Sequence, residues 1–227
     1  QRIFDQEARG ASGVVEEEDD DVARSSIFDA KLRGDLAYDA PEVLREAVST
    51  LLLQQQEEPG VRRHEDTRAT TRGRAPFQNG LDLGCGTGIN GPIFRDLVGG
   101  AWFGVDVSQG MARVAWSRAV GSPGKSYDRV FEADIEDVLI RLDAEKKVKP
   151  SKATEILRLV QSTGDVEPHD MDSVIKPSNM ELDALASTTW DLITASDSLI
   201  YTGDLSAIFH AISSCLSSGG LFALSLE

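Results

Sequence analysis

Three closely spaced glycines, Gly84, Gly86 and Gly88, follow an apolar run that contains Asp82. Glycines at alternate positions let the backbone turn sharply and bring a ligand against bare amide groups. Asp106 ends the next apolar run, 106 − 84 = 22 residues after the first glycine, which suits one loop, one helix and one strand. In α/β nucleotide sites, a carboxylate at the end of the second strand holds ribose hydroxyls. The pattern therefore predicts a nucleoside-binding site.

The spacing of the glycines separates two classes of nucleotide. A dinucleotide fingerprint has the form G-x-G-x-x-G, and the helix that follows it faces a pyrophosphate. Here Gly88 comes one residue too early, and Ile89 takes the position of the last glycine. Asp82 adds an acid beside the loop, which would repel a pyrophosphate but could serve a ligand ammonium group, directly or through water. The pattern thus disfavours a nicotinamide dinucleotide.

The glycine loop and Asp106 together resemble motif I and the ribose-binding acid of the class I S-adenosylmethionine-dependent methyltransferases. The resemblance implies that S-adenosyl-L-methionine is the cofactor. It also implies that Asp134 accepts a hydrogen bond from the adenine amino group, that Ile135 flanks the ring and that Met111 packs beneath it. The implied cofactor-binding residues are Asp82, Gly84, Cys85, Gly86, Thr87, Gly88, Asp106, Val107, Met111, Asp134, Ile135 and Ser196.

Residues 190–205 resemble motif IV of a family of predicted methyltransferases sometimes associated with tetratricopeptide repeats, although this chain has no helical repeats of its own. The resemblance implies that Ser196 and Asp197 border the methyl group. The segment lacks the Asn/Asp-Pro-Pro-Tyr element typical of enzymes that methylate planar amino groups, which argues against DNA adenine or glutamine amide acceptors. The resemblance covers residues 25–53, 81–135 and 190–227.

Asp197 and Tyr201 are the candidate catalytic residues, either as general bases or as positioning groups for the acceptor. Methyl transfer is an in-line displacement, so catalysis can come mostly from placing a desolvated nucleophile behind the methyl group. A base is needed only where the acceptor carries a proton at the working pH. Asp197 could instead cap a helix and Tyr201 could simply pack, so both interpretations stay open.

The composition limits the class of protein. The chain has 227 residues and a formal net charge of -15 at pH 7, which argues against a nucleic-acid partner. Its two cysteines, Cys85 and Cys215, form no disulfide framework and favour a reducing compartment. Neither a membrane-length apolar run nor a signal-peptide core is present, which predicts a cytoplasmic protein without membrane contact. The histidines are dispersed, so no metal site is expected.

Alternating strand and helix patterns predict a Rossmann-like, doubly wound α/β fold with a parallel sheet. The predicted strands span residues 80–83, 101–105, 129–133, 191–195 and 221–226. The predicted helices span residues 41–53, 92–98, 135–142, 153–160 and 204–216, with one more that Ser108 caps. In helix 204–216 the residues expected to face the core are Leu205, Ile208, Phe209, Ile212 and Leu216.

We expect a single methyltransferase domain over residues 25–227, after a disordered acidic segment at residues 1–24. Polar composition predicts insertions at residues 54–76 and 136–188. In the family that the chain resembles, two further strands complete the sheet, and we expect these C-terminal strands to be missing from this chain.

The favoured function is methyl transfer to an oxygen or nitrogen of a small-molecule acceptor. A protein substrate is the second possibility, with residues 136–188 shaping a groove for it. The third is a regulatory protein that binds the cofactor without catalysis, because a glycine loop and an acid indicate binding and not turnover. A nicotinamide oxidoreductase is the remaining alternative, and the glycine spacing opposes it.

Overall fold

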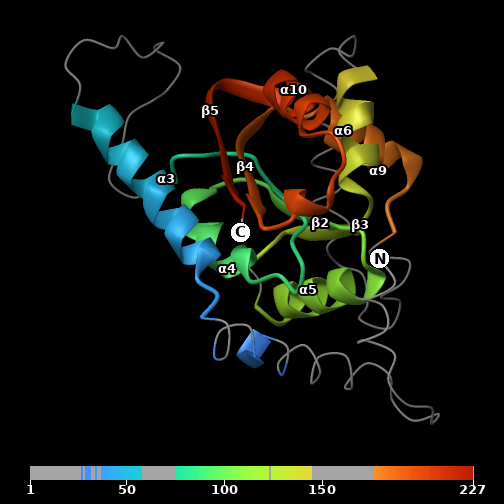
Figure 1. Cartoon of the computed structure of the whole chain (residues 1–227), viewed down its shortest axis with the longest axis horizontal. Coiled ribbons are helices and arrows are strands. Elements are labelled where there is room, and N and C mark those ends of the chain that lie inside the picture. The colour runs from blue at the N-terminus through green and yellow to red at the C-terminus, as the bar shows by residue number, and fades with distance from the viewer. Residues whose placement is uncertain are drawn as a thin grey trace.

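Five parallel strands form one sheet in the order β3-β2-β1-β4-β5 (Figure 1). The computed structural model describes residues 27, 29–31, 34, 37–57, 75–122, 124–144 and 176–226. The strands are β1 (Gly80–Leu83), β2 (Trp102–Asp106), β3 (Arg129–Glu132), β4 (Trp190–Ser196) and β5 (Leu216–Ser225). The chain runs outward from β1 to β3 and then crosses to β4 on the other side of β1. This reversal is the topological switch point at which open α/β sheets bind ligands.

Helices cover both faces of the sheet, which confirms the doubly wound α/β fold (Figure 1). One face packs against α6 (Ile135–Ala144), α9 (Asn179–Ser187) and α10 (Leu205–Cys215). The other packs against α3 (Ala40–Glu57), α4 (Asn90–Phe94), the 3-10 helix η1 (Arg95–Leu97) and α5 (Gln109–Gly121). A second 3-10 helix, η3 (Leu199–Tyr201), follows β4.

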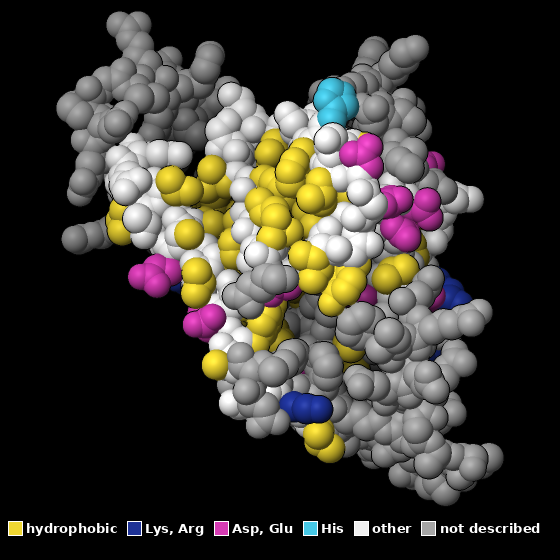
Figure 2. Space-filling view, viewed as in Figure 1, with side chains coloured by type: hydrophobic (Ala, Val, Ile, Leu, Met, Phe, Trp, Pro, Cys, Tyr) yellow, Lys and Arg dark blue, Asp and Glu magenta, His cyan; other side chains and the backbone are white. Residues whose placement is uncertain are grey.

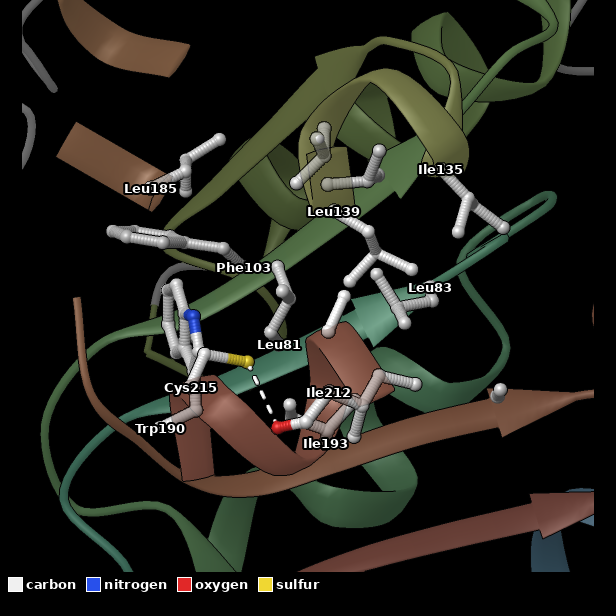
Figure 3. Packing of buried hydrophobic residues seen from close by; sticks show 14 of the residues in the cluster. Leu81, Leu83, Phe103, Ile135, Leu139, Leu185, Trp190, Ile193, Ile212 and Cys215 are labelled. Atoms are coloured by element: carbon white, nitrogen blue, oxygen red, sulfur yellow. Dashed lines mark hydrogen bonds between the residues drawn. The ribbon is translucent and has the colours of Figure 1, made fainter. Parts of the chain in front are cut away.

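The core on the α6 side arises from alternation along the strands (Figure 3). Leu81 and Leu83 of β1 lie beside Phe103 of β2 and Ile193 of β4, and all four are fully buried. Strand residues two apart share a face, so this alternation predicts one apolar layer. The helical side chains that complete the layer in Figure 3 include Ile135, Leu139, Leu185, Ile212 and Cys215.

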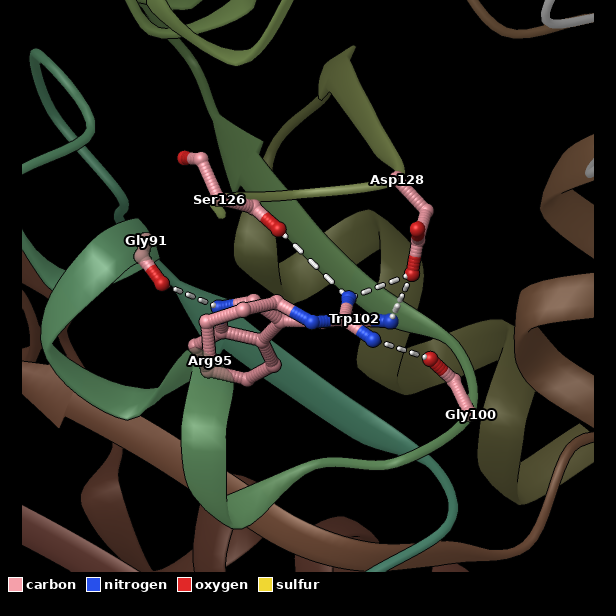
Figure 4. A network of polar contacts seen from close by, with 6 residues as sticks. All are labelled: Gly91, Arg95, Gly100, Trp102, Ser126 and Asp128. Atoms are coloured by element: carbon pink, nitrogen blue, oxygen red, sulfur yellow. Dashed lines mark hydrogen bonds and ion pairs between the residues drawn. The ribbon is translucent and has the colours of Figure 1, made fainter. Parts of the chain in front are cut away.

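On the other face, a polar network fixes the segment after the glycine loop (Figure 4). The Asp128 carboxylate accepts hydrogen bonds from Arg95 Nη1 at 2.7 Å and from the Trp102 amide at 2.8 Å. Arg95 Nη2 donates to the Gly100 carbonyl at 2.8 Å, and the Trp102 indole donates to the Gly91 carbonyl at 3.1 Å. These contacts hold α4 and η1 against β2 and so limit where the glycine loop can lie.

Several element boundaries differ from the sequence predictions. The helix expected at residues 92–98 begins at Asn90 and tightens into η1 at Arg95. Strand β5 begins at Leu216, five residues before its predicted start (221 − 216). It pairs with β4 on both sides of a bulge, because Trp190 pairs with Leu216 whereas Leu192 pairs with Leu221. Helix α9 was not predicted, and its start carries a capping box in which Ser178 and Glu181 bond each other's backbone amides.

Phe209 was predicted to face the core, and that prediction is wrong. Its side chain is 40% exposed and packs edge-on against Phe222 of β5, with ring centroids 5.9 Å apart. Figure 2 shows hydrophobic side chains gathered over β5, between α10 and α3. A 3.6-residue period gives the direction of an apolar stripe but not how far the neighbouring strand covers it.

Some predictions fall outside the described residues. These are the acidic segment 1–24, residues 58–74 of the first insertion, and the helix at 153–160. Within the second predicted insertion, α6 and α9 contribute buried side chains to the core. No helix in the part of the chain that the structure describes is long and apolar enough to span a membrane.

Candidate functional site

The glycine loop joins the end of β1 to the end of β2. The amides of Gly84 and Cys85 both donate to the Val105 carbonyl, at 2.8 and 2.9 Å, so the chain turns tightly over β2. Gly84 has φ +74°, and a Cβ there would lie 2.2 Å from the Cβ of Ser198. Because an L side chain at this position meets both strain and a clash, the loop can follow this path only with glycine.

Asp106 is bonded directly to this loop. Its carboxylate accepts hydrogen bonds from the Gly86 amide and from the Ser108 amide, both at 2.8 Å. Burial raises the pKa of Asp106 above its ordinary value, and the two amide hydrogen bonds oppose that shift. A Cβ at Gly86 would have none of the described residues within 4 Å, so the backbone faces open space among them. The loop and the acid, linked in the sequence only by spacing, therefore form one unit with an accessible edge.

Asp82 lies beneath the loop and not at its surface. The side chain is 0% exposed and accepts hydrogen bonds from Thr194 Oγ1 at 2.5 Å, Tyr127 OH at 2.5 Å and Asn90 Nδ2 at 2.9 Å. Burial raises the pKa of Asp82, and the three donors oppose the shift. This placement directs the carboxylate toward three donors of the protein itself. Asp82 is a support for β1, β4 and the start of α4.

Asn90 connects that buried network to the end of β4. Its amide nitrogen donates to Asp82 and also to Ser196 Oγ, at 3.0 Å. Sequence reasoning missed Asn90, Tyr127 and Thr194. Asn90 comes two residues after Gly88, which is the only local signal among them. Tyr127 and Thr194 reach Asp82 from 45 and 112 residues away, so no local pattern marks them.

The other predicted cofactor residues divide between surface and interior. Val107 is 43% exposed beside Asp106, and Met111 is half-buried in the first turn of α5. Asp134 is exposed and accepts a hydrogen bond from the Glu136 amide at 2.8 Å. Ile135, in contrast, is buried in the core of the α6 face. Cys85 is buried as well, and burial together with the Asp106 and Asp82 charges raises its pKa well above the ordinary thiol value.

Both candidate catalytic residues follow β4 in the chain. Asp197 adopts a left-handed backbone with φ 52°. Its carboxylate accepts a hydrogen bond from the Ser225 hydroxyl at 2.6 Å, and its backbone amide donates one to the Ser225 hydroxyl oxygen at 3.0 Å. A non-glycine residue in this conformation costs energy and is often found at functional sites. Tyr201, in η3, is 70% exposed. Ser225 was missed because it lies 28 residues from Asp197.

These groups all lie at the carboxyl ends of neighbouring parallel strands, on both sides of the switch point between β1 and β4. The fold is that of a doubly wound α/β domain, and domains of this class bind ligands at this edge of the sheet. Within the described residues, no cluster of three or more His, Cys, Asp or Glu side chains is arranged to hold a metal ion.

The sequence matches the family described as "Methyltransferase domain" over residues 36–226, and the chain belongs to this family. No curated relative matches it. The narrower likeness to the tetratricopeptide-associated methyltransferases stays a prediction.

Solved structures similar to this chain include an S-adenosylmethionine-dependent methyltransferase from Clostridium acetobutylicum, with 19% identity and a TM-score of 0.48 over 89% of this chain. Another is the magnesium protoporphyrin IX methyltransferase of Synechocystis, with 15% identity and a TM-score of 0.39 over 94% of this chain. The chain spans 55% of the Clostridium protein and 66% of the Synechocystis protein.

Proposed function

We propose that this protein is an S-adenosylmethionine-dependent methyltransferase that acts on an oxygen or nitrogen of a small-molecule acceptor. The observation that carries the proposal is the contact of the Asp106 carboxylate with the Gly86 amide at the switch point of the sheet. An ionised carboxylate offers about four lone-pair positions, and the two amides occupy two of them. The remaining positions are available to the two hydroxyls of a ribose.

The residues around Asp106 fit an adenosyl group. The open space at Gly86 allows a ligand to approach the bare backbone. The exposed Val107 and the half-buried Met111 would give apolar contact to the adenine ring, and the exposed Asp134 would accept from its amino group. When bound, S-adenosylmethionine supplies a methyl group on a positively charged sulfur. The protein's part is to orient that group and to exclude water from it.

The end of β4 supports the acceptor side of the proposal. Asp197 is held by Ser225, and the exposed Ile200 and Tyr201 follow three and four residues later. A carboxylate beside apolar side chains suits a small acceptor that has both a ring or chain and a polar atom to be methylated. Asp197 would orient that polar atom or take its proton where the acceptor is protonated. The net charge of -15 disfavours nucleic acid as acceptor.

Calorimetric titration with S-adenosylmethionine, S-adenosylhomocysteine and NAD tests the proposal, first on the native protein and then on Asp106→Ala. We expect micromolar binding of both adenosyl ligands and none of NAD. Asp106→Ala removes a charged acceptor from two hydroxyls, so affinity should fall by about 100-fold or more. The exposed Asp137 of α6 provides a matched control, and Asp137→Ala should bind like the native protein.

Each outcome has a distinct meaning. Binding of NAD alone would overturn the proposal in favour of an oxidoreductase. Binding of the adenosyl ligands without turnover in a broad acceptor screen would favour the cofactor-binding regulatory protein. Loss of affinity in Asp106→Ala alone would justify screening oxygen and nitrogen acceptors by release of S-adenosylhomocysteine.

A further inference from the structure

We propose that Asp29 is a positioning residue for the cofactor, acting through Thr87 of the glycine loop. Asp29 precedes the domain's first strand by about fifty residues of chain (80 − 29 = 51) and takes no part in the sheet. Its side chain is nevertheless only 15% exposed, because it lies against the loop and α5. This inference rests on the proposed cofactor site and deepens it.

Three contacts join Asp29, the loop and α5. The Thr87 hydroxyl donates to Asp29 Oδ1 at 2.8 Å. Arg118 Nη1, from the last turn of α5, lies 2.5 Å from Asp29 Oδ2. The same nitrogen donates to the Thr87 carbonyl at 3.0 Å. Both the side chain and the backbone carbonyl of Thr87 are therefore held, and each holding group is charged, which makes these hydrogen bonds stronger than neutral ones.

The position of Thr87 gives these contacts a consequence for the ligand. Thr87 directly follows Gly86, whose amide donates to Asp106. Glycines on both sides of Thr87 leave the loop backbone free to adopt other conformations, since Gly86 and Gly88 have φ values of +54° and +86°. Fixing Thr87 selects the conformation in which the Gly86 amide meets Asp106. A loop that is already ordered before binding loses less entropy when the ligand arrives.

Variants of these contacts can distinguish a role of Asp29 in positioning the glycine loop from a role in packing alone. Asp29→Ala removes both partners of the carboxylate. Asp29→Asn keeps an oxygen for the Thr87 hydroxyl but loses the charge that pairs with Arg118. Thr87→Val removes the hydroxyl at nearly constant volume, and Thr87→Ser restores it. Asp39, an exposed acid in the same part of the chain, gives the matched control Asp39→Ala.

The experiment measures the affinity of S-adenosylhomocysteine by calorimetry and its dissociation rate by stopped flow, with urea unfolding of each ligand-free variant alongside. We expect Asp29→Ala and Thr87→Val each to weaken binding about 10-fold, mainly through faster dissociation. The double variant should bind no more weakly than Asp29→Ala, because Asp29→Ala already removes the acceptor of the Thr87 hydroxyl. Thr87→Ser, which keeps the hydroxyl, should bind more tightly than Thr87→Val, and Asp29→Asn should fall between the native protein and Asp29→Ala. The control Asp39→Ala should bind like the native protein.

The outcomes distinguish this inference from the proposed function. If the native protein binds S-adenosylhomocysteine and Asp29→Ala binds it within about twofold, Asp29 does not position the loop and the inference is overturned alone. Additive losses in the double variant would also overturn it, because Asp29 would then act independently of Thr87. If the native protein binds no adenosyl ligand, both the proposed function and this inference fail.

Discussion

The two halves of the candidate site are built in different ways. At the ends of β1 and β2, backbone amides and buried carboxylates hold the chain, as in the Gly86 contact to Asp106 and the three donors to Asp82. At the ends of β4 and β5, hydrogen bonds between side chains join Asp197 to Ser225 and Ser196 to Asn90, and the nearby Tyr201 side chain reaches solvent.

This difference indicates in which half of the site residues can be substituted without loss of the fold. A site made of backbone groups recognises one invariant ligand, and changing it disturbs the sheet itself. A site made of exposed side chains can be altered for different acceptors at little structural cost. Asn90 joins the two halves through Asp82 and Ser196, so they share one buried support.

The largest expected effect comes from breaking that support. Asp82→Ala leaves three buried donors without their acceptor, so we expect the free energy of unfolding to fall by about 3–5 kcal/mol. Urea unfolding followed by circular dichroism measures it. The exposed Asp137→Ala should change stability by less than about 0.5 kcal/mol. A small loss for Asp82→Ala would mean that its donors find other partners.

A second test compares two glycines of the loop. Gly84→Ala combines a left-handed backbone with a clash against Ser198, so it should cost about 2–4 kcal/mol of stability. Gly86→Ala meets only the backbone strain, about 1–2 kcal/mol, because the space around its Cβ is open. Gly86→Ala should instead weaken S-adenosylhomocysteine binding. Equal stability losses in the two variants would contradict the described loop geometry.

The pH dependence of stability sharpens the contrast between buried and exposed carboxylates. Burial raises the pKa of Asp82, so the folded protein holds this proton more tightly than the unfolded chain does. The resulting stability is full below the unfolded pKa and is lost as the pH rises through the raised pKa. Asp82→Asn should therefore cost more stability near about pH 4 than near about pH 7. Urea unfolding at both pH values measures this, and an equal cost at both would count against it.

The smallest effects on cofactor binding are expected at β4 and β5. Asp197→Asn and Ser225→Ala should leave S-adenosylhomocysteine affinity within about twofold, because they share no hydrogen bond with Asp106 or the loop. Turnover with any acceptor found should fall in both. A large loss of cofactor affinity in either variant would show that the two halves are not separable.

Much of the fold was predictable because hydrophobic periodicity and helix-capping or turn residues are local features of the sequence. The residues 80–83 were assigned to a strand with the observed bounds, and Ser108 accepts from the Met111 amide as the predicted cap of α5. The start of β5 was not predictable, because Gly219 and Gly220 indicate a turn while pairing with β4 extends the strand through them. Tertiary pairing outweighed the local preference.

The candidate site was predictable only in part, for a related reason. Glycine spacing and the distance to Asp106 are set along the chain, and the structure brings them into contact. The environment of a side chain is not set along the chain. Asp82 and Ile135 were predicted as cofactor-binding residues, but nothing in the sequence indicated that both side chains would be buried. An alternating strand sends every second side chain to the same face, but which helix covers that face depends on packing.

From local patterns alone, the sequence indicated the five strands, the tight turn after β1 and the acid at the end of β2. Each of these follows from neighbours a few residues apart or from one strand–helix–strand unit. Only the tertiary structure decided that Asp29 contacts Thr87 across 58 residues, that Thr194 reaches Asp82 across 112, and that Ser225 holds Asp197. Such contacts depend on sheet order and register, which emerge when the whole core packs and which no local pattern contains.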